Sequence, residues 1–517
     1  MPPSLGSPAE PWWKSAVVYQ IYPRSFADAD GDGVGDLEGV RRHLDHLAWL
    51  GVDALWLSPI FRSPMKDFGY DVADYCDVDP LFGTLADVDR LIAEAHARGL
   101  RVLLDWVPNH TSDRHPWFVA ARRSRTDPRR DWYVWRDPAP GGGPPNNWVA
   151  AFGRGAPAWT LDSATGQYYL HLFLPEQPDL DWANPAVVEA MHDVLRFWLT
   201  RGVDGFRVDV AHGLGKDPRL ADDPPHLAGV PHAVLNDHPS THAILRGLRR
   251  VVDGFPGDRV LLGEVYLLGA DTHPQYYGRG GDELHLVFEL PAAVTAPWDV
   301  LEWRARIERA ATVLDPIGAW PTWVLSNHDT PRHRTRFGSE VHARAAAVLL
   351  LTLRGTPVLY AGEELGLEDA VVPSERRVDP GGRDGCRAPI PWDADPGHGW
   401  TGAEPWLPWP PEPGRQNVAT ARAEAGSILH LYRRLLAARR ASPALRLGSS
   451  RLLPAPEGVL AWERVRDDDR RLVLVNFLAR PVACAFRGAV AVASDGAGEG
   501  AAFAGTLGAD QAVLLVP

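Results

Sequence analysis

The stretch Gly205-Phe206-Arg207-Val208-Asp209-Val210-Ala211-His212 is typical of a short buried β-strand. Its apolar residues alternate with Arg207 and Asp209, and side chains on a strand switch faces at every residue, so the two charges share one face. Two buried charges on one face must serve each other or a ligand. Arg207 favours the ionised form of Asp209, and an ionised carboxylate at the end of a core strand is a candidate nucleophile. A structural ion pair is the alternative, and this stretch alone does not decide between them.

Similar apolar segments recur on both sides of this strand and alternate with segments of helical periodicity. The predicted strands are 16–21, 54–57, 101–106, 205–209, 260–264, 284–290, 320–326 and 357–360. The predicted helices are 37–50, 85–98, 186–201, 242–252, 301–311, 341–351 and 428–440. Eight parallel strands with outer helices predict an α/β fold, the (β/α)8 TIM barrel.

Two regions depart from this alternation and predict additional domains. Residues 107–180 are rich in Pro, Gly, Trp and Asn, which indicates a subdomain inserted after the third strand. Residues 445–517 contain short β-rich runs between turns, which predict a small C-terminal all-β domain of the sandwich type. The catalytic barrel would then comprise residues 1–106 and 181–444.

The composition excludes several kinds of partner. The 517 residues carry a net charge of −13, which disfavours nucleic acid and anionic membranes and favours a neutral substrate or a cation. Three scattered cysteines form neither a disulfide framework nor a metal-ligand spacing. The N-terminus lacks the apolar core of a signal peptide, and no apolar run is long enough to span a bilayer. We expect a soluble cytoplasmic protein, either a monomer or a homodimer.

Polar residues follow four of the predicted strands, at the end where a barrel carries its active site. The third strand ends in Asp105 and is followed by His110, and the fourth ends in Asp209. The fifth ends in Glu264, and the seventh is followed by His328 and Asp329. Each position alone has an ordinary structural explanation, but their convergence on one rim indicates a catalytic site. No P-loop, Gly-x-Ser-x-Gly elbow or Cys/His metal spacing competes with it.

The chemistry that suits these residues is glycoside hydrolysis. The reaction needs an ionised carboxylate at the anomeric carbon and a carboxylic acid of raised pKa at the leaving oxygen. We expect Arg207 to hold Asp209 ionised and Glu264 to act as acid and later as base. Adjacent strands lie about 4.8 Å apart, which is closer to the carboxyl spacing of about 5–5.5 Å in retaining enzymes than to the wider inverting gap.

These four stretches, in this order, resemble the signature regions of glycoside hydrolase family 13, the α-amylase family. The resemblance extends from about Trp13 into the C-terminal domain. It implies that Asp209 is the nucleophile, Glu264 the acid/base and Asp329 the stabiliser of the transition state. It further implies that Asp105 supports the site. The implied substrate-binding residues at these strands are Arg207, His110 and His328.

Further segments are similar to the oligo-1,6-glucosidase and α-glucosidase subgroup, among them residues 13–26 and 177–182. In that subgroup the positions of Asp67 and Tyr70 contact the non-reducing glucose, with the tyrosine as a stacking platform. An arginine in residues 383–389 would pair with Asp67, and we assign Arg387, with Arg383 as the competitor. Phe152 and Phe173 match aromatic positions of the same pocket, although for Phe152 a place in the subdomain core is equally compatible.

The loop 28–36, Asp-Ala-Asp-Gly-Asp-Gly-Val-Gly-Asp, has acidic residues at alternate positions, a pattern that suits an oxygen-ligated Ca²⁺ or Mg²⁺. It lacks the bidentate Glu of an EF-hand at position 12, where Gly39 stands. The alternative is a solvated acidic turn. Relatives in the subgroup bind a structural Ca²⁺ here, which implies as ligands Asp28, Asp30, Asp32, the Val34 carbonyl and Asp36.

The sequence thus predicts an exo-acting, retaining α-glucosidase that releases glucose from the non-reducing end of short α-glucosides. The alternative within enzymes is net transglycosylation or isomerisation, as in sucrose or maltose isomerisation, by the same residues. Val210 is typical of α-1,6-acting relatives, whereas residues 211–213 resemble α-1,4-acting ones, so linkage preference stays open. A non-catalytic transporter subunit is disfavoured because all three acids are present and no membrane anchor is seen.

Overall fold

The computed structural model describes residues 10–153, 155–231, 237–267, 273–288 and 294–517. Eight strands form one parallel sheet in the order β11-β10-β9-β5-β2-β1-β13-β12. A parallel bridge between Phe288 and Thr322 joins its two ends and closes the barrel, which confirms the predicted fold class. The strands are β1 (Val18–Ile21), β2 (Ala54–Leu57), β5 (Arg101–Trp106), β9 (Gly205–Val208), β10 (Val260–Gly263), β11 (Leu286–Val287), β12 (Thr322–Val324) and β13 (Thr356–Tyr360).

The larger helices surround this sheet, and several begin at a side chain that caps the first turn. Thr84 and Asp87 form a capping box at α4, and Ser427 accepts the His430 N–H at α12. These helices are α2 (Leu37–Arg42), α3 (Leu44–Leu50), α4 (Leu85–Ala97), α6 (Pro185–Thr200), α7 (Pro239–Asp253), α8 (Val300–Leu314), α10 (Glu340–Thr352) and α12 (Ile428–Ala441). The short helices are α1 (Trp12–Ser15), α5 (Pro116–Ala121), α9 (His333–Phe337), α11 (Val418–Ala423) and α13 (Pro443–Leu447).

Several predicted elements differ in extent from those observed, and one helix and one strand illustrate the differences. The helix expected over 37–50 is two helices, because the backbone of His43 leaves the helical region (φ −104°, ψ 8°). The strand expected over 284–290 is shorter, since β11 covers Leu286–Val287 and Phe288 adds a single bridge. Residues 289 and 290 of that prediction lie outside the described residues.

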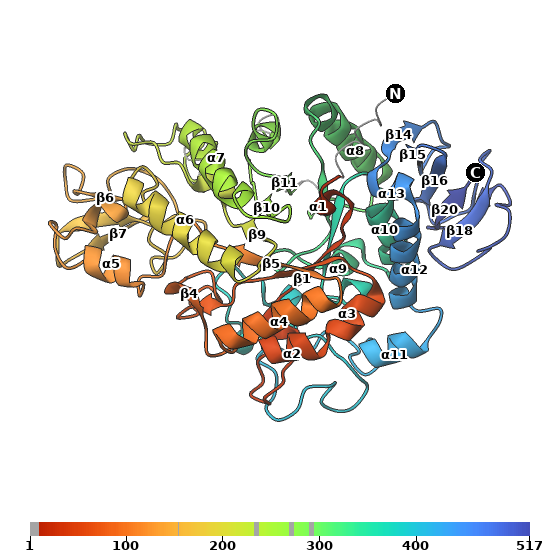
Figure 1. Ribbon diagram of the computed structural model, residues 1–517, viewed down its shortest axis with the longest axis horizontal. Helices are drawn as coiled ribbons and strands as arrows, with labels where there is room; N and C mark the ends of the chain where they lie inside the picture. Colours follow the sequence, from red (N-terminus) through yellow and green to blue (C-terminus); the bar gives the residue numbers. More distant parts are fainter. Residues whose placement is uncertain (1–9, 154, 232–236, 268–272, 289–293) are drawn as a thin grey trace, which may run out of the picture.

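The insertion after β5 contains a three-stranded antiparallel sheet in the order β6-β8-β7. Its strands are β6 (Trp135–Arg136), β7 (Trp159–Asp162) and β8 (Gln167–Leu170), and they lie at one end of the long axis in Figure 1. A separate two-stranded ribbon of β3 (Phe61–Arg62) and β4 (Asp74–Val78) precedes α4. Aromatic rings fill the small core of the insertion, among them Trp148 and Trp159.

The C-terminal region forms a five-stranded antiparallel sheet in the order β14-β15-β16-β20-β18, at the other end of the long axis (Figure 1). A two-stranded sheet of β17 and β19 accompanies it. The predicted limit between residues 444 and 445 falls inside α13, which packs on β15 and β16. The strands are β14 (Ser449–Leu453), β15 (Val459–Arg466), β16 (Asp469–Asn476), β17 (Val482–Ala483), β18 (Ala489–Ala493), β19 (Thr506–Leu507) and β20 (Ala512–Val516).

Alternate strand residues fill the barrel interior with apolar side chains, among them Trp56, Leu103 and Leu262. Leu262 pairs in register with Arg207 on β9, and Arg207 pairs with Asp105 on β5. Arg207 and Asp105, which we call the charged layer, therefore adjoin the apolar layer near the C-terminal ends of the strands. Among the described residues, none of the helices combines the length and the apolar character needed to cross a bilayer.

Candidate active site

Arg207 lies at the centre of the charged layer and contacts three acids. Its Nη1 lies 2.9 Å from Oδ1 of Asp105 and 2.5 Å from Oδ1 of Asp209, and its Nη2 lies 2.9 Å from Oε1 of Glu264. The Arg207 residue is only 1% exposed. A buried guanidinium presents a fixed fork of donors, so it sets the relative positions of the three carboxylates.

Asp209 and Glu264 come together because β9 and β10 are adjacent parallel strands. Val208 pairs in register with Gly263, so the residues that follow them are neighbours on the same rim. Immediately after Asp209 the backbone turns into the left-handed region at Val210 (φ 44°, ψ 41°), and the Val210 N–H donates to Oε2 of Glu264 at 3.1 Å. The two predicted catalytic acids therefore face one space, as two-carboxylate glycoside hydrolysis requires.

The charge on Asp209 is not set by Arg207 alone, which corrects the sequence-based expectation. Burial raises the pKa of Asp209 well above its usual range, and Glu264, Asp105 and Asp329 add to the rise, while Arg207 opposes it. Burial also raises the pKa of Asp105 to about 6, although attraction to Arg207 opposes this rise.

Asp329 has the opposite electrostatic environment. Burial alone would raise its pKa, but attraction to the two arginines Arg383 and Arg387 opposes burial and holds the pKa below its usual range. Arg383 Nη1 lies 2.8 Å and Arg387 Nη2 lies 3.2 Å from Oδ1 of Asp329. Asp329 is thus held as a carboxylate, in the form that can balance positive charge on a reacting sugar.

His328 and Tyr70 form a stacked pair beneath the cavity. Their rings lie 5.4 Å apart and nearly parallel, at an angle of 6°, and the Tyr70 hydroxyl contacts both Nε2 of His328 and, at 3.0 Å, Oδ2 of Asp105. Burial lowers the pKa of His328 to about 3, so the ring is neutral at physiological pH. Tyr70 is thereby fixed in position on the wall of the cavity.

The arginine that pairs with Asp67 is Arg383, and the prediction of Arg387 for this role was wrong. Arg383 Nη2 lies 2.6 Å from Oδ1 of Asp67. Arg387, on the short helix Asp384–Arg387, points into the protein, where it contacts Asp379 at 3.1 Å and the His328 carbonyl at 2.8 Å. The guanidinium of Arg383 also lies over the ring of Phe152, 5.1 Å from its centre.

A cavity of about 370 Å³ lies above these groups, a volume within the range of small-molecule sites. Eight of the eleven residues predicted to be catalytic or substrate-binding line it: Asp67, Tyr70, His110, Phe152, Phe173, Asp209, Glu264 and Asp329. Three others are at most 1% exposed and lie behind the wall: Arg207, His328 and Arg387. They position the lining residues, whereas the sequence predicted direct contact with substrate.

Three further lining or supporting residues carry no role in the sequence-based prediction. Gln177 Nε2 lies 3.1 Å from Oδ2 of Asp67 and 3.0 Å from Nε2 of His110, and so ties the two together. His212 and Tyr266 line the end of the cavity near Glu264, and the Tyr266 N–H contacts Nδ1 of His212 at 3.3 Å. All three lie in or within two residues of quoted segments, which is the signal that could have found them.

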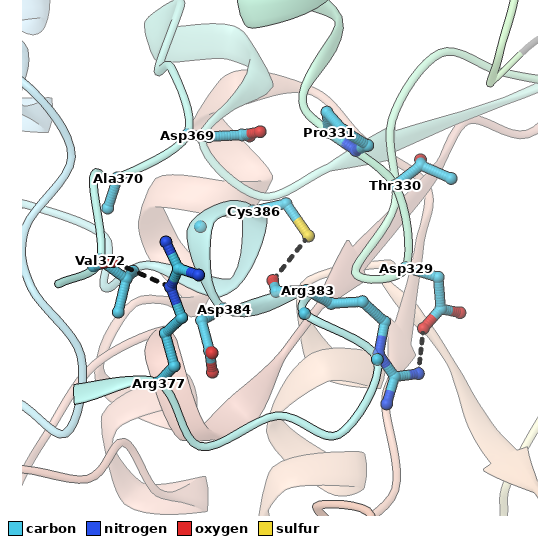
Figure 2. Close-up of a pocket in the computed structure, with 13 residues that line it drawn as sticks. Asp329, Thr330, Pro331, Asp369, Ala370, Val372, Arg377, Arg383, Asp384 and Cys386 are labelled. Carbon is cyan, nitrogen blue, oxygen red and sulfur yellow. Dashed lines mark hydrogen bonds and ion pairs between the residues drawn. The ribbon is translucent and has the colours of Figure 1, made fainter. Parts of the chain in front are cut away.

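A second cavity, of about 440 Å³, adjoins the first and is shown in Figure 2. Asp329, Gly381 and Arg383 line both, so Arg383 stands between them. The Arg383 side chain reaches Asp329 while Arg377 bends away to donate to the Val372 carbonyl at 3.2 Å (Figure 2).

The acidic loop after β1 brings together three of its four predicted aspartate ligands. Carboxylate oxygens of Asp28, Asp30 and Asp36 lie within 4.8 Å of one another, and hard oxygen donors at this spacing suit Ca²⁺. The predicted ligand Asp32 is outside this group, because its Oδ1 accepts the Val34 N–H at 2.8 Å. A Cβ at Gly33 (φ +91°) would lie 2.4 Å from the Glu404 carbonyl oxygen, so only glycine lets the loop pack there.

A closed (β/α)8 barrel with paired acids facing one cavity on its C-terminal rim has the arrangement that a glycoside hydrolase uses. Residues 20–448 match the α-amylase catalytic domain, and the chain belongs to the α-amylase family, glycoside hydrolase family 13. It is 44% identical over 508 residues to a probable α-glucosidase of Rhizobium meliloti, covering 92% of this chain and 90% of that protein. It is 37% identical to an oligo-1,6-glucosidase of Parageobacillus thermoglucosidasius, covering 90% of each.

Solved structures support the same placement. The α-glucosyl transfer enzyme XgtA superimposes with a TM-score of 0.91 at 40% identity, over 98% of this chain and 99% of that chain. The trehalulose synthase MutB of Pseudomonas mesoacidophila MX-45 superimposes with a TM-score of 0.93 at 34% identity, over 98% and 100% of the two chains.

Proposed function

We propose that this hydrolase is an exo-acting, retaining α-glucosidase of short α-glucosides. The observation that carries the proposal is the position of Arg383, which links Asp67 and Asp329 on the wall of the catalytic cavity. Such an ion-paired wall would close the pocket behind one glucose, and this favours release of single glucose units from the non-reducing end.

In the proposed reaction, Asp209 attacks the anomeric carbon while Glu264 gives its proton to the departing glycosidic oxygen. The bond to the aglycone breaks as the bond to Asp209 forms. Glu264, now a carboxylate, takes a proton from water, which displaces Asp209 and regenerates both acids. The Asp329 carboxylate balances the positive charge that develops on the ring.

Asp209→Asn tests the nucleophile, with an aryl α-glucoside as substrate. We expect loss of turnover with unchanged circular dichroism and Tm, since the amide keeps the shape of the carboxylate. The first-formed anomer, followed by proton NMR, should be the α form of glucose. Near-normal turnover in the variant, or β-glucose as first product, would contradict the proposal.

A second candidate activity is glucosyl transfer or isomerisation by the same residues. It is favoured by the likeness to XgtA and MutB, whose names describe glucosyl transfer and trehalulose synthesis. The two activities differ in whether water or a sugar enters beside Glu264. Product analysis at high maltose, isomaltose and sucrose separates them: glucose as the dominant product indicates hydrolysis, and new disaccharides indicate transfer.

We further propose that the acidic loop holds a structural Ca²⁺, with Mg²⁺ as the alternative. Asp28, Asp30 and Asp36 would hold the ion with Asp32 and the Val34 carbonyl completing its oxygen shell. Bound there, the ion supplies positive charge that lets the acids lie together. We also propose a cytoplasmic location and a monomeric or homodimeric state.

A further inference from the structure

A cavity of about 280 Å³ opens at the N-terminal end of the barrel strands. Val17 and Asp53 on its wall immediately precede β1 and β2, whereas Asp209 and Glu264 follow β9 and β10. Because all eight strands are parallel, this cavity lies at the opposite end of the barrel from the catalytic cavity. Its lining residues are Ser15, Val17, Gly51, Asp53, Leu436, Arg439, Arg440 and Arg446.

The wall carries three arginines and one carboxylate. Both oxygens of Asp53 are already engaged, Oδ1 by Nη2 of Arg440 at 2.9 Å and Oδ2 by the Val17 N–H at 2.9 Å. Arg446 Nη2 donates to Oγ of Ser15 at 3.1 Å. The cavity therefore has an excess of two positive charges, in a chain whose net charge is −13.

Arg439 is the buried member of this group, at 1% exposure. Three of its five N–H groups donate to carbonyl oxygens, those of Leu351 (3.1 Å), Leu445 (3.0 Å) and Gly355 (2.7 Å). Its Nε is buried and has no acceptor among the described residues. Within the same described part of the chain, Arg439 forms no ion pair, and burial lowers its pKa to about 10. A buried charge and donor without partners are costly unless a ligand supplies them.

We propose that this cavity is a binding site for a small oxyanion of the phosphate type. Arg439 forms its buried base, and Arg440 and Arg446 close over the anion from the more exposed side. Guanidinium groups match tetrahedral oxyanions with paired N–H donors, and a dianion would neutralise the excess of two positive charges. The ligand is either free phosphate or the phosphate group of a small monoester.

Binding would join elements that are far apart in the sequence. The cavity lies between the end of α1, the turn from α3 into β2, the last turn of α12 and α13. An anion held by arginines from α12 and α13 therefore acts as a clamp between the barrel floor and the helices that lead to the C-terminal sheet. Since a ligand that binds only the folded state stabilises it, occupancy should raise the Tm.

The test is a calorimetric and thermal titration of the full chain with inorganic phosphate, with sodium chloride added to keep the ionic strength constant. The test variant is Arg440→Gln/Arg446→Gln, and the matched control is Arg433→Gln, an exposed arginine of the same helix whose Nε contacts the Trp49 carbonyl. We expect saturable binding of phosphate by the unmodified chain and by the control. In the double variant the dissociation constant should be at least tenfold larger. Turnover of an aryl α-glucoside verifies that each variant is folded.

Methyl phosphate and sulfate, titrated in the same way, identify the ligand. Tighter binding of methyl phosphate assigns the site to a monoester, and tighter binding of inorganic phosphate assigns it to the free ion. The proposal would be overturned if all anions shifted the Tm equally and without saturation. It would also be overturned if phosphate shifted the Tm equally in the double variant and in the control. Arg439→Met, if it folds, should lose saturable binding altogether.

Discussion

Nη1 of Arg383 lies 2.8 Å from Oδ1 of Asp329, although 54 residues separate the two in the chain. The same guanidinium contacts Asp67 and Asp379, so a single side chain ties the loop after β13 to the catalytic rim. The wall of the proposed glucose pocket depends on this one contact set.

Arg383→Lys should lower kcat/KM for an aryl α-glucoside by roughly 100-fold, because a lysine keeps the charge but cannot bridge Asp67 and Asp329 at once. Steady-state kinetics measure the effect. Arg377→Lys, an exposed arginine of the same loop, is the matched control and should stay within about twofold. Equal losses in the two variants would show that Arg383 has no special role.

Arg387→Met should act on stability more than on substrate binding. Arg387 is fully buried, and its removal leaves the His328 carbonyl and part of the charge of Asp379 without a donor. We expect the free energy of unfolding to fall by about 3 kcal/mol, measured by urea denaturation. A variant of unchanged stability would mean that its partners find other donors.

Glu264→Gln should separate the acid step from nucleophilic attack. For maltose, whose leaving group needs protonation, kcat should fall by roughly 10²–10⁴-fold. For 2,4-dinitrophenyl α-glucoside, the leaving group departs without a proton, so the rate of the first step should be nearly unchanged. A stopped-flow measurement of the burst of released dinitrophenolate gives this rate. Asp209→Asn serves as the comparison, since it should abolish the burst with both substrates.

Removal of the divalent cation should destabilise the chain, because Asp28, Asp30 and Asp36 then repel one another. With Ca²⁺ at about 100 times its dissociation constant, the stabilisation lost to chelation is about 2.7 kcal/mol, measured as a lower Tm in EDTA. Asp30→Asn should show a smaller Ca²⁺-dependent shift. Asp74→Asn, at another exposed aspartate, is the control. A Tm that changes with neither EDTA nor added Ca²⁺ would contradict the metal site.

The buried acid Glu363 should make the protein less stable as pH rises. Burial raises its pKa from the ordinary 4.5 to about 8, so between these values the folded state holds a proton that the unfolded state has lost. Stability is then greatest below about pH 4.5 for this group and falls by up to about 1.4 kcal/mol per pH unit until about pH 8. Glu363→Gln, which can still accept the Tyr432 hydroxyl, should flatten this part of the stability–pH curve. A curve parallel to that of the unmodified protein would contradict the shift.

The sequence by itself determined the barrel and the catalytic rim. Strand alternation puts Arg207 and Asp209 on one face, and the order of the eight strands makes β9 and β10 neighbours. Together these place Asp209 beside Glu264 without knowledge of any loop. The physical reason is that period-2 side-chain orientation and parallel register are local rules that hold in every such sheet.

Only the tertiary structure decided between Arg383 and Arg387. They lie four residues apart around one short helical turn, and the local sequence does not indicate which of the two side chains points to Asp67. Likewise, only the tertiary structure shows that Asp53 lies beside Arg439, Arg440 and Arg446, which are about 390 residues later in the chain. The direction of a loop side chain depends on packing between distant segments, and no pattern within either segment encodes it.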